Sequence, residues 1–238
     1  MSADAAAAAA GGWSTSARWE GCTKQTATPR IRHILRDVEE QNGLYRAHSN
    51  ELIDQSRTDA NLSFRPVVNA DGSIGKERIT SVQGVFDHLE AGLAKAQRWR
   101  VIGPTRRVKV LDATGKPVLD PVTGKPAYKQ VPNPRAGERV PVALRADTAV
   151  CVEELFQLDP EFTGPISEMT PEMRETIQEL YDVWYADLVD QYGVENVLCI
   201  SEHWDETSPH VSAFVMPLTA EGDLNVKLFT TGKKKPTR

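Results

Sequence analysis

The feature that most constrains how this chain can fold is a polar turn between two apolar runs near its C-terminus. Apolar residues lead into the turn over 197–200 and lead out of it over 211–215, with Thr207-Ser208-Pro209 between them. Two such runs joined by polar residues and a proline predict a β-hairpin. Folding the chain back at Pro209 would bring the imidazoles of His203 and His210 close together.

The same turn carries two carboxylates, Asp205 and Glu206, between the two histidines. Imidazole and carboxylate groups together suit a divalent cation such as Mn²⁺, Mg²⁺ or Zn²⁺. Only five histidines occur in the 238 residues, and two of them lie here. The pattern indicates a metal site formed by His203, Glu206 and His210, with Asp205 as a further candidate ligand. The alternative is a polar hairpin end whose histidines satisfy backbone groups, and spacing alone leaves both open and names no reaction.

Composition limits the class of protein. With 40% hydrophobic and 26% charged residues, the chain is expected to form one large domain, or one domain with a tail. We expect a disordered leader over 1–15, because its alanine run is too short for a membrane span and lacks the basic flank of a targeting signal. The three cysteines are far apart and odd in number, which favours a reducing, cytoplasmic location.

Charge is unevenly distributed along the chain. The net charge of −5 argues against a uniformly basic nucleic-acid-binding surface. Basic residues nevertheless cluster over 98–109, where Trp99 lies among them, over 30–36 and over 233–235. Each cluster taken alone is more typical of a solvated surface than of a binding site.

Apolar periodicity and turn residues divide the rest of the chain into elements. Thr170-Pro171 followed by glutamates predicts the start of a long helix that ends at Tyr192-Gly193. Two Thr-Gly-Lys-Pro repeats indicate an inserted β-hairpin within about 107–142. The expected order is a strand at 16–24, a helix at 31–41, a polar loop at 49–64, a helix at 81–99, the insertion, a strand at 143–155, the long helix and the final hairpin. This order predicts an α+β fold, with a mostly antiparallel sheet, helices on one face and the other face open for a long ligand.

A second group of polar residues lies in the N-terminal half. His33 and Arg36 are one helical turn apart, and the segment HSNELIDQSRTDAN follows them. Guanidinium and amide groups at this density are used to hold phosphate oxygens and to contact nucleic-acid backbones or base edges. The alternative is a capped, hydrogen-bonded loop. The polar candidates of the segment are His48, Asn50, Asp54, Arg57, Thr58 and Asn61.

Taken together, these regions resemble the plasmid mobilisation relaxases of the Mob/Pre (MobV) family. Members carry an N-terminal His-x-x-Arg, a downstream HSN…ID..R[ST]…N element and a later HxDExxPHxH motif. Here the three read His33-Ile34-Leu35-Arg36, then residues 48–61, then HWDETSPH at 203–210. The likeness covers roughly 16–218 apart from the insertion, and the last motif is quite specific.

The resemblance implies an HUH-type endonuclease fold and a defined activity. A relaxase nicks one strand of supercoiled plasmid DNA at an origin of transfer, stays attached to the 5′ end, and later rejoins the strand. The implied cofactor is a divalent metal, Mn²⁺ or Mg²⁺ rather than Zn²⁺, which the histidines hold beside the scissile phosphate. The implied catalytic domain spans 16–228, and a basic tail follows at 229–238.

The resemblance also implies roles for single residues. His33 would be the nucleophile and would form a phosphoramidate, with Tyr45 as the alternative nucleophile. Arg36 would orient the phosphate or the nucleophile. DNA contacts are implied for His48, Asn50, Arg57 and Asn61.

The chain departs from the family pattern in two ways. Ser212 stands where the family has a third histidine, so Glu206 or Asp205 and water would have to complete the coordination. The chain also ends soon after the hairpin, where members usually continue into a helical region that contacts partners. This departure leaves open that the chain is a fragment of a longer relaxase. Binding to a coupling protein or self-association is implied by the resemblance alone.

Other functions stay open from the sequence. A relaxase derivative that binds origin DNA without cutting it would tolerate the loss of the third histidine. A metal-dependent hydrolase such as a zinc protease or phosphodiesterase is a further alternative, although HWDETSPH lacks the HExxH spacing that places two ligands on one helical face. A rolling-circle replication initiator would share the relaxase chemistry.

Overall fold

The structure is a computed structural model that describes residues 15–43 and 53–227. These residues form two compact units. One contains the elements before Gln97 and after Leu144, and the other is the segment Gln97–Leu144. The leader at 1–14 and the tail at 228–238 lie outside the described residues, as does 44–52.

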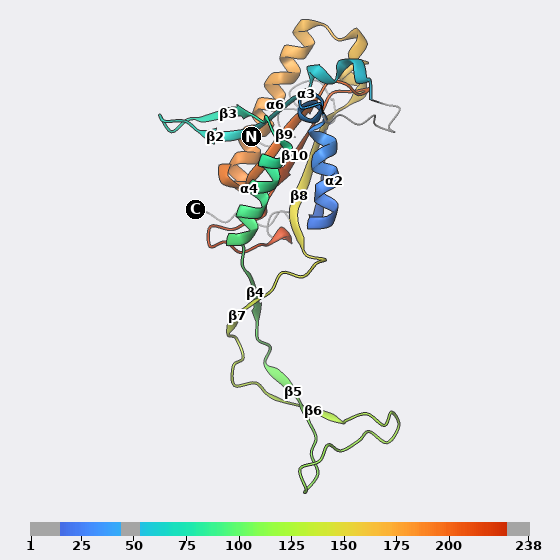
Figure 1. Ribbon diagram of the computed structural model, residues 1–238, viewed down its shortest axis with the longest axis vertical. Coiled ribbons are helices and arrows are strands. Elements are labelled where there is room, and N and C mark those ends of the chain that lie inside the picture. The colour runs from blue at the N-terminus through green and yellow to red at the C-terminus, as the bar shows by residue number, and fades with distance from the viewer. Residues whose placement is uncertain (1–14, 44–52, 228–238) are drawn as a thin grey trace. The chain divides into compact units, whose positions relative to one another are not determined.

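The first unit is built on a six-stranded antiparallel sheet (Figure 1). Its strand order is β1-β8-β10-β9-β2-β3. The predicted hairpin therefore forms the middle of the sheet, because β10 lies between β8 and β9 and β9 lies between β10 and β2. The strands are β1 (Thr15–Thr23), β2 (Leu62–Val68), β3 (Ile74–Arg78), β8 (Ala149–Leu158), β9 (Val197–His203) and β10 (His210–Val215).

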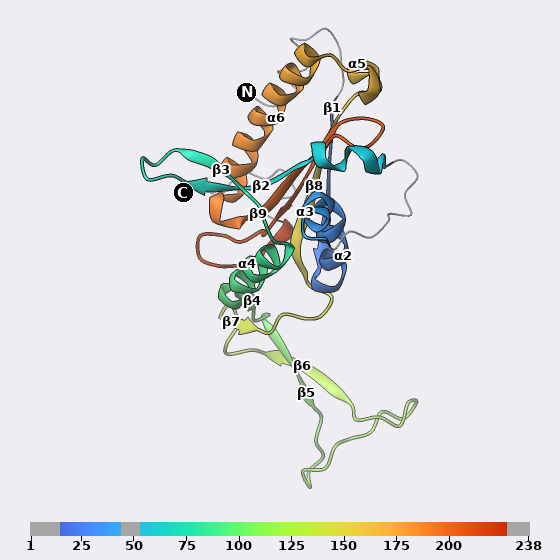
Figure 2. The same cartoon turned by 45° about the horizontal axis from the view of Figure 1, so that its top comes forward.

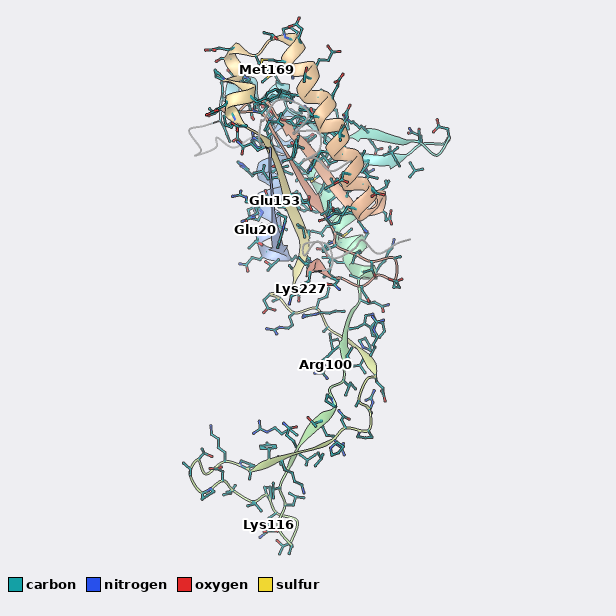
Figure 3. The ribbon with its side chains drawn as sticks, turned by 180° about the vertical axis from the view of Figure 1, so that it is seen from behind. Glu20, Arg100, Lys116, Glu153, Met169 and Lys227 are labelled. Atoms are coloured by element: carbon teal, nitrogen blue, oxygen red, sulfur yellow. The ribbon has the colours of Figure 1, made fainter. Side chains whose placement is uncertain are left out.

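Helices cover both faces of this sheet, as the opposite views in Figures 1 and 3 show. One core packs α2, α3 and α4 against the sheet, and the other packs α6 against its opposite face. The prediction of an α+β fold with an antiparallel sheet is confirmed, but helices on one face only was wrong. The helical elements of this unit are α2 (Lys24–Ile34), α3 (Arg36–Gln41), η1 (Gln55–Ala60), α4 (Val82–Lys95), α5 (Pro160–Thr163), η2 (Ile166–Glu168), α6 (Pro171–Tyr192) and η3 (Val194–Asn196).

The reason for the second covered face lies in the central strands. Seven consecutive residues of β9 are buried, so its side chains on both faces need a packing partner. Glu202 points to the α6 face, where Tyr185 donates a hydrogen bond to it at 2.6 Å. Ser201 points to the other face, where its hydroxyl donates to the carbonyl of Ile34 at 2.7 Å.

The long helix α6 begins and ends where its sequence predicts. The hydroxyl of Thr170 accepts a hydrogen bond from the backbone N–H of Met173, and Pro171 occupies the first turn. Gly193 ends the helix with a φ of 86°, a conformation that glycine adopts without strain. Its buried side carries aromatic residues that pack on one another and on the sheet, among them Tyr181, Trp184 and Tyr185.

The N-terminal helix is longer and more divided than its sequence suggests. It starts at Lys24, where Thr23 accepts a hydrogen bond from the N–H of Thr26, rather than at Ile31. It ends at Ile34, and α3 starts at Arg36 after the non-helical Leu35. This break places His33 in the last turn of one helix and Arg36 in the first turn of the next.

An ion-pair group ties α2 to the sheet edge. Arg30 reaches Glu20 of β1 at 2.8 Å and Glu153 of β8 at 2.7 Å. Figure 3 labels the two carboxylates, which lie on neighbouring strands. The group fixes α2 across the β1–β8 pair.

The second unit, which we call the ribbon unit, is Gln97–Leu144. It consists of two antiparallel two-stranded ladders, β4 (Arg98–Val101) with β7 (Arg139–Val142) and β5 (Thr105–Lys109) with β6 (Tyr128–Pro132). The predicted β structure around the repeats is thus present, and the compact unit extends about ten residues further toward the N-terminus than 107–142. In the described part of the chain, no helix has the length and apolar character needed to cross a membrane.

Candidate functional site

Two histidines face each other at the loop end of the central hairpin. His203 is the last residue of β9 and His210 the first of β10, and they are directly opposite in the strand register. Their ring centroids are 4.8 Å apart. Nδ1 of His203 is buried and has no hydrogen-bond partner among the described residues, whereas Nδ1 of His210 lies 3.2 Å from the carbonyl of Ser208. Nδ1 of His203 is therefore a ring nitrogen that no described group of the protein satisfies.

The environment keeps both imidazoles neutral. Burial is the main reason why the pKa of His203 lies well below its ordinary value, and the charges of Arg36, His210 and His33 add to the effect. Burial also lowers the pKa of His210, although the nearby carboxylate of Glu206 acts in the opposite direction. Neutral imidazole is the form that binds a metal ion, so the site is in its ligating state near neutral pH.

The loop between the two histidines is held by hydrogen bonds from Arg36. The guanidinium of Arg36 is fully buried, and its Nε donates to Oδ2 of Asp205 at 2.8 Å. Its Nη2 donates to Oδ1 of the same carboxylate and to Oε1 of Glu206 at 3.0 Å. Burial on its own would raise the pKa of Asp205, but the hydrogen bonds and charge of Arg36 outweigh it, and the pKa lies below its ordinary value.

The segment η1 holds the same loop from the side (Figure 2). Thr58 donates its hydroxyl hydrogen to Asp205 at 3.1 Å, and Arg57 donates to the carbonyl of Trp204 at 2.9 Å. Asn61 accepts the backbone N–H of Trp204 at 2.7 Å. These bonds come from the R-T-x-x-N part of the second sequence element, so that element positions the β9–β10 loop directly.

The opposite face of the sheet anchors the loop through Trp204. Its ring lies 4.5 Å from the guanidinium carbon of Arg174, and its indole N–H donates to Glu202 at 3.3 Å. Glu202 in turn accepts hydrogen bonds from Tyr185 and Gln178 of α6. The loop is thus gripped by side chains from both sides of the sheet.

His33 lies within electrostatic range of the histidine pair. It is half-buried in the last turn of α2, and its carbonyl accepts a hydrogen bond from Nη1 of Arg36 at 3.2 Å. Its charge contributes to the lowered pKa of His203. The N-terminal His-x-x-Arg and the hairpin motif therefore meet in space.

The structure places three of the expected site residues in the support of the loop. Both oxygens of Asp205, a candidate metal ligand, accept hydrogen bonds from Arg36 or Thr58. Arg36, expected to orient the phosphate or the nucleophile, is fully buried and donates to the carbonyl of His33. Asn61, expected to contact DNA, is 2% exposed and accepts the backbone N–H of Trp204.

The remaining candidates fall into two groups. His203, Glu206 and His210 lie around one loop, but the described residues contain no group of three His, Cys, Asp or Glu side chains arranged to hold a metal. Glu206 is turned to Arg36. The other candidates, Tyr45, His48 and Asn50, lie outside the described residues.

A buried polar network beside the site is not apparent from sequence patterns. Ser63 of β2 donates to Asp37 at 2.6 Å and lies 2.9 Å from the hydroxyl of Ser201. Burial raises the pKa of Asp37, against the hydrogen bond from Ser63. Two serines in separate strands are not a local sequence signal, because only the strand register places them side by side.

The sequence of the chain is similar to those of known plasmid recombination enzymes. The family model described as plasmid recombination enzyme (Mob_Pre) matches residues 135–237. Proteins called plasmid recombination enzyme type 3, from Staphylococcus aureus and Mammaliicoccus lentus, are each 29% identical over 94 residues. The match covers 40% of this chain and 21% of each relative, so it spans about a fifth of their length.

A solved structure shares the fold. It is the MobM relaxase domain (MOBV; Mob_Pre) bound to plasmid pMV158 oriT DNA in an Mn-bound crystal form. The TM-score is 0.50 at 18% sequence identity, over 90% of this chain and 76% of that chain. At this identity, the likeness establishes the arrangement of helices and strands.

We predict strong coupling between Arg36 and Asp205. Arg36→Gln or Asp205→Asn alone should lower the free energy of unfolding by about 3–5 kcal/mol, because each removes one partner of a buried ion pair and leaves the charge of the other in the interior. The double variant should lose clearly less than the sum of the two single losses. Urea unfolding of the four proteins measures this, and strictly additive losses would show that the pair does not act as a unit.

We also predict that unfolding depends on pH through the histidine pair when metal is chelated. The folded state keeps His203 and His210 neutral, whereas the unfolded chain takes up protons as the pH falls below about 6.5. The unfolded state then binds more protons than the folded state. The free energy of unfolding must therefore fall as the pH is lowered, by up to about 1.4 kcal/mol per pH unit for each histidine.

The measurement is denaturant unfolding in chelating buffer between about pH 7.5 and 5.5, above the range where carboxylates titrate. The double variant His203→Gln/His210→Gln should flatten the dependence. His88→Gln removes a histidine outside the pair and serves as the control. An unchanged slope in the double variant would contradict the assignment.

Proposed function

We propose that the chain is a relaxase of the Mob/Pre family, which nicks and rejoins one strand of plasmid DNA at an origin of transfer. The observation that carries this proposal is the buried Arg36, whose guanidinium donates both to the carbonyl of His33 and to Asp205 in the loop between His203 and His210. The two motifs come from opposite ends of the chain and are joined by the buried Arg36–Asp205 ion pair. Metal-assisted phosphoryl transfer uses a nucleophile together with ligands for a cation, and the two motifs supply these groups.

The histidine pair suits a divalent cation. Both rings are neutral, they face each other, and Nδ1 of His203 is buried without a partner among the described residues. We propose that His203 and His210 hold Mn²⁺ or Mg²⁺, with Glu206 or water completing the coordination. Such an open set fits these ions, which keep water and accept phosphate oxygens, better than a closed zinc site. When bound, the cation would supply positive charge beside the scissile phosphate.

The covalent step would be carried by His33. A ring nitrogen attacks the scissile phosphorus, a P–N bond forms, and the P–O bond to the 3′ oxygen breaks. The 3′ oxygen leaves with a proton as a hydroxyl group, and the ring gives up its own N–H proton. The 5′ end then remains on the protein, and the reverse reaction with a 3′ hydroxyl rejoins the strand. Tyr45 remains the alternative nucleophile.

The residues around this step have separate tasks. Arg36 is a positioning residue, because it holds both the carbonyl of His33 and the carboxylate of Asp205. Arg57 is half-buried and donates one hydrogen bond to the loop within the described residues, which leaves further N–H donors for a DNA phosphate. We assign the remaining DNA contacts to His48 and Asn50 by the resemblance.

We predict metal-dependent nicking. Incubating the protein with Mn²⁺ and supercoiled DNA that carries its own origin of transfer should give a relaxed circle with protein on the 5′ end. His33→Ala should reduce adduct formation on the order of 10³-fold or more, because the nucleophile is lost. Denaturing gels of the labelled DNA measure the adduct, and Tyr45→Phe is the matched control. If His33→Ala forms the full adduct and Tyr45→Phe forms none, the nucleophile is the tyrosine. If the unaltered protein, with both residues intact, forms no adduct, the activity is rejected.

A second function is favoured by one observation, the serine at the position of a third imidazole. Ser212 lies two residues after His210 and therefore on the same face of β10. It is 3% exposed and lies opposite Ser201, so it offers no strong metal ligand. A chain that binds origin DNA without cutting it is the function expected if two imidazoles do not suffice.

Metal titration separates the two functions. Calorimetry should show one Mn²⁺ site that disappears in His203→Ala and in His210→Ala. Ser212→His should raise the affinity by about tenfold or more by adding a ligand nitrogen, while Ser212→Leu adds bulk alone and should not. If the protein binds origin DNA but no Mn²⁺, and Ser212→His restores binding, the non-catalytic function is the correct one.

A further inference from the structure

The ribbon unit carries a charge opposite to that of the rest of the chain. Between Gln97 and Leu144 there are ten lysine and arginine residues and three acidic ones, a net charge of +7. The whole chain has a net charge of −5, so all remaining residues together carry −12. Figure 3 labels Arg100 and Lys116 within this unit. A separation of this size shows that the basic residues are concentrated rather than scattered.

The few acidic groups of the unit are engaged locally. Asp112 accepts hydrogen bonds from Thr114 and from the N–H of Lys116, and Asp120 accepts them from Thr123 and the N–H of Val122. These bonds close two tight turns, and they lower the pKa of both carboxylates. The third acidic group, Glu138, is paired with Arg135 at 2.7 Å.

The two Thr-Gly-Lys-Pro repeats are the sequence form of these turns. In each repeat the threonine bonds the aspartate, and the glycine takes a positive φ, 82° at Gly115 and 65° at Gly124. Each turn thereby uses its acidic group internally and leaves an exposed lysine, Lys116 or Lys125, at its end. The repeats thus present positive charge and remove negative charge.

Basic side chains project from both faces of the β5–β6 ladder. Arg107 and Lys109 share one face, and Arg106 and Lys129 share the other, because alternate residues point to opposite sides. All four are exposed, and none is in an ion pair within the described part of the chain. Like charges on one face repel each other, so the arrangement costs stability until an anionic partner binds.

The exposed aromatic rings of the unit are covered by guanidinium groups. Arg107 lies 4.2 Å from the ring centroid of Tyr128, and Arg139 lies 5.2 Å from that of Trp99. A ring covered in this way offers less stacking surface to an unpaired base. A two-stranded ribbon with cations on both faces instead matches the major groove of a duplex, which admits such a ribbon between two phosphate walls.

We propose that the ribbon unit is a second DNA-binding element, which grips the phosphate backbones of duplex DNA without reading its sequence. The choice of DNA as ligand rests on the proposed relaxase function, but binding by this unit requires neither the metal nor the nucleophile. The exposed apolar residues at the turns, such as Val122 at 90% exposure, make an anionic membrane the rival partner.

The test uses the full chain and two matched triple variants that remove the same charge. Arg106→Gln/Lys109→Gln/Lys129→Gln alters the ribbon unit and leaves the Arg107–Tyr128 contact in place. Lys24→Gln/Lys95→Gln/Arg145→Gln alters three exposed cations outside the ribbon unit. Binding is measured by fluorescence anisotropy at several salt concentrations, with a labelled duplex of unrelated sequence that exceeds two helical turns, without divalent metal.

The ribbon variant should bind the duplex about 10- to 100-fold more weakly. The slope of its log affinity against log salt concentration should be smaller in magnitude by about 2.7, because three phosphate contacts are lost. The control variant should keep most of both. Gln130→Lys adds a cation beside Arg107 and should strengthen binding severalfold, which keeps the test informative if the triple variant folds poorly. The same two variants are also tested for binding to phosphatidylserine vesicles. Equal losses of duplex affinity in the two triple variants, or a loss of vesicle binding without a loss of duplex binding in the ribbon variant, would overturn the proposal.

Failure of the proposed function would be recognised separately. The ribbon variant should still form the covalent adduct with a single-stranded oligonucleotide that contains the nick site. If the unaltered chain forms no adduct but binds duplex through the ribbon unit, relaxase activity fails and the binding element stands. If adduct forms and the ribbon substitutions change nothing, the reverse holds.

Discussion

The arrangement of the site depends on one buried ion pair, between Arg36 of α3 and Asp205 in the β9–β10 loop. Both side chains are fully buried, and the pair joins residues that are 169 positions apart in the sequence. The same guanidinium holds the carbonyl of His33 and the carboxylate of Glu206. Removing one partner would leave a charge in the interior, so the pair strongly favours the single arrangement in which the two motifs meet.

This interaction explains the division of labour within the motifs. In the hairpin motif the two histidines flank the loop and face each other, whereas the first acidic residue is directed inward and fastens the loop. In His-x-x-Arg the histidine is left half-buried near the site, and the arginine three positions later supplies the fastening group. The R-T-x-x-N part of the second element adds hydrogen bonds from Arg57, Thr58 and Asn61 to the same loop. Residues from all three motifs thus hold the β9–β10 loop, and the hydrophobic cores on both faces of the sheet keep the strands that carry this loop in place.

Much of the local structure could be predicted from the sequence. The hairpin followed from apolar runs around Pro209, and the ends of α6 followed from Thr170-Pro171 and Gly193, because turns and caps depend on neighbouring residues. Helices on both sheet faces could not be predicted, since this depends on which strands become central. For the same reason the contacts by which Arg36, Asp205 and Asn61 support the loop could not be predicted, because a polar residue in a motif looks alike whether it faces a substrate or supports a loop. The network of Asp37, Ser63 and Ser201 requires the strand register and has no local sequence signal.

The central claim is that His33 faces a metal held by His203 and His210, and paramagnetic NMR tests it most directly. Bound Mn²⁺ broadens the ring signals of nearby histidines, and His88 is the internal reference. Its Nε2 lies 3.0 Å from the carbonyl of Glu195, just before β9, so it should be about 20 Å from the far end of that strand. The account predicts that substoichiometric Mn²⁺ broadens His33 together with His203 and His210 and leaves His88 sharp. Sharp His33 signals in a protein whose His203 and His210 are fully broadened would contradict it.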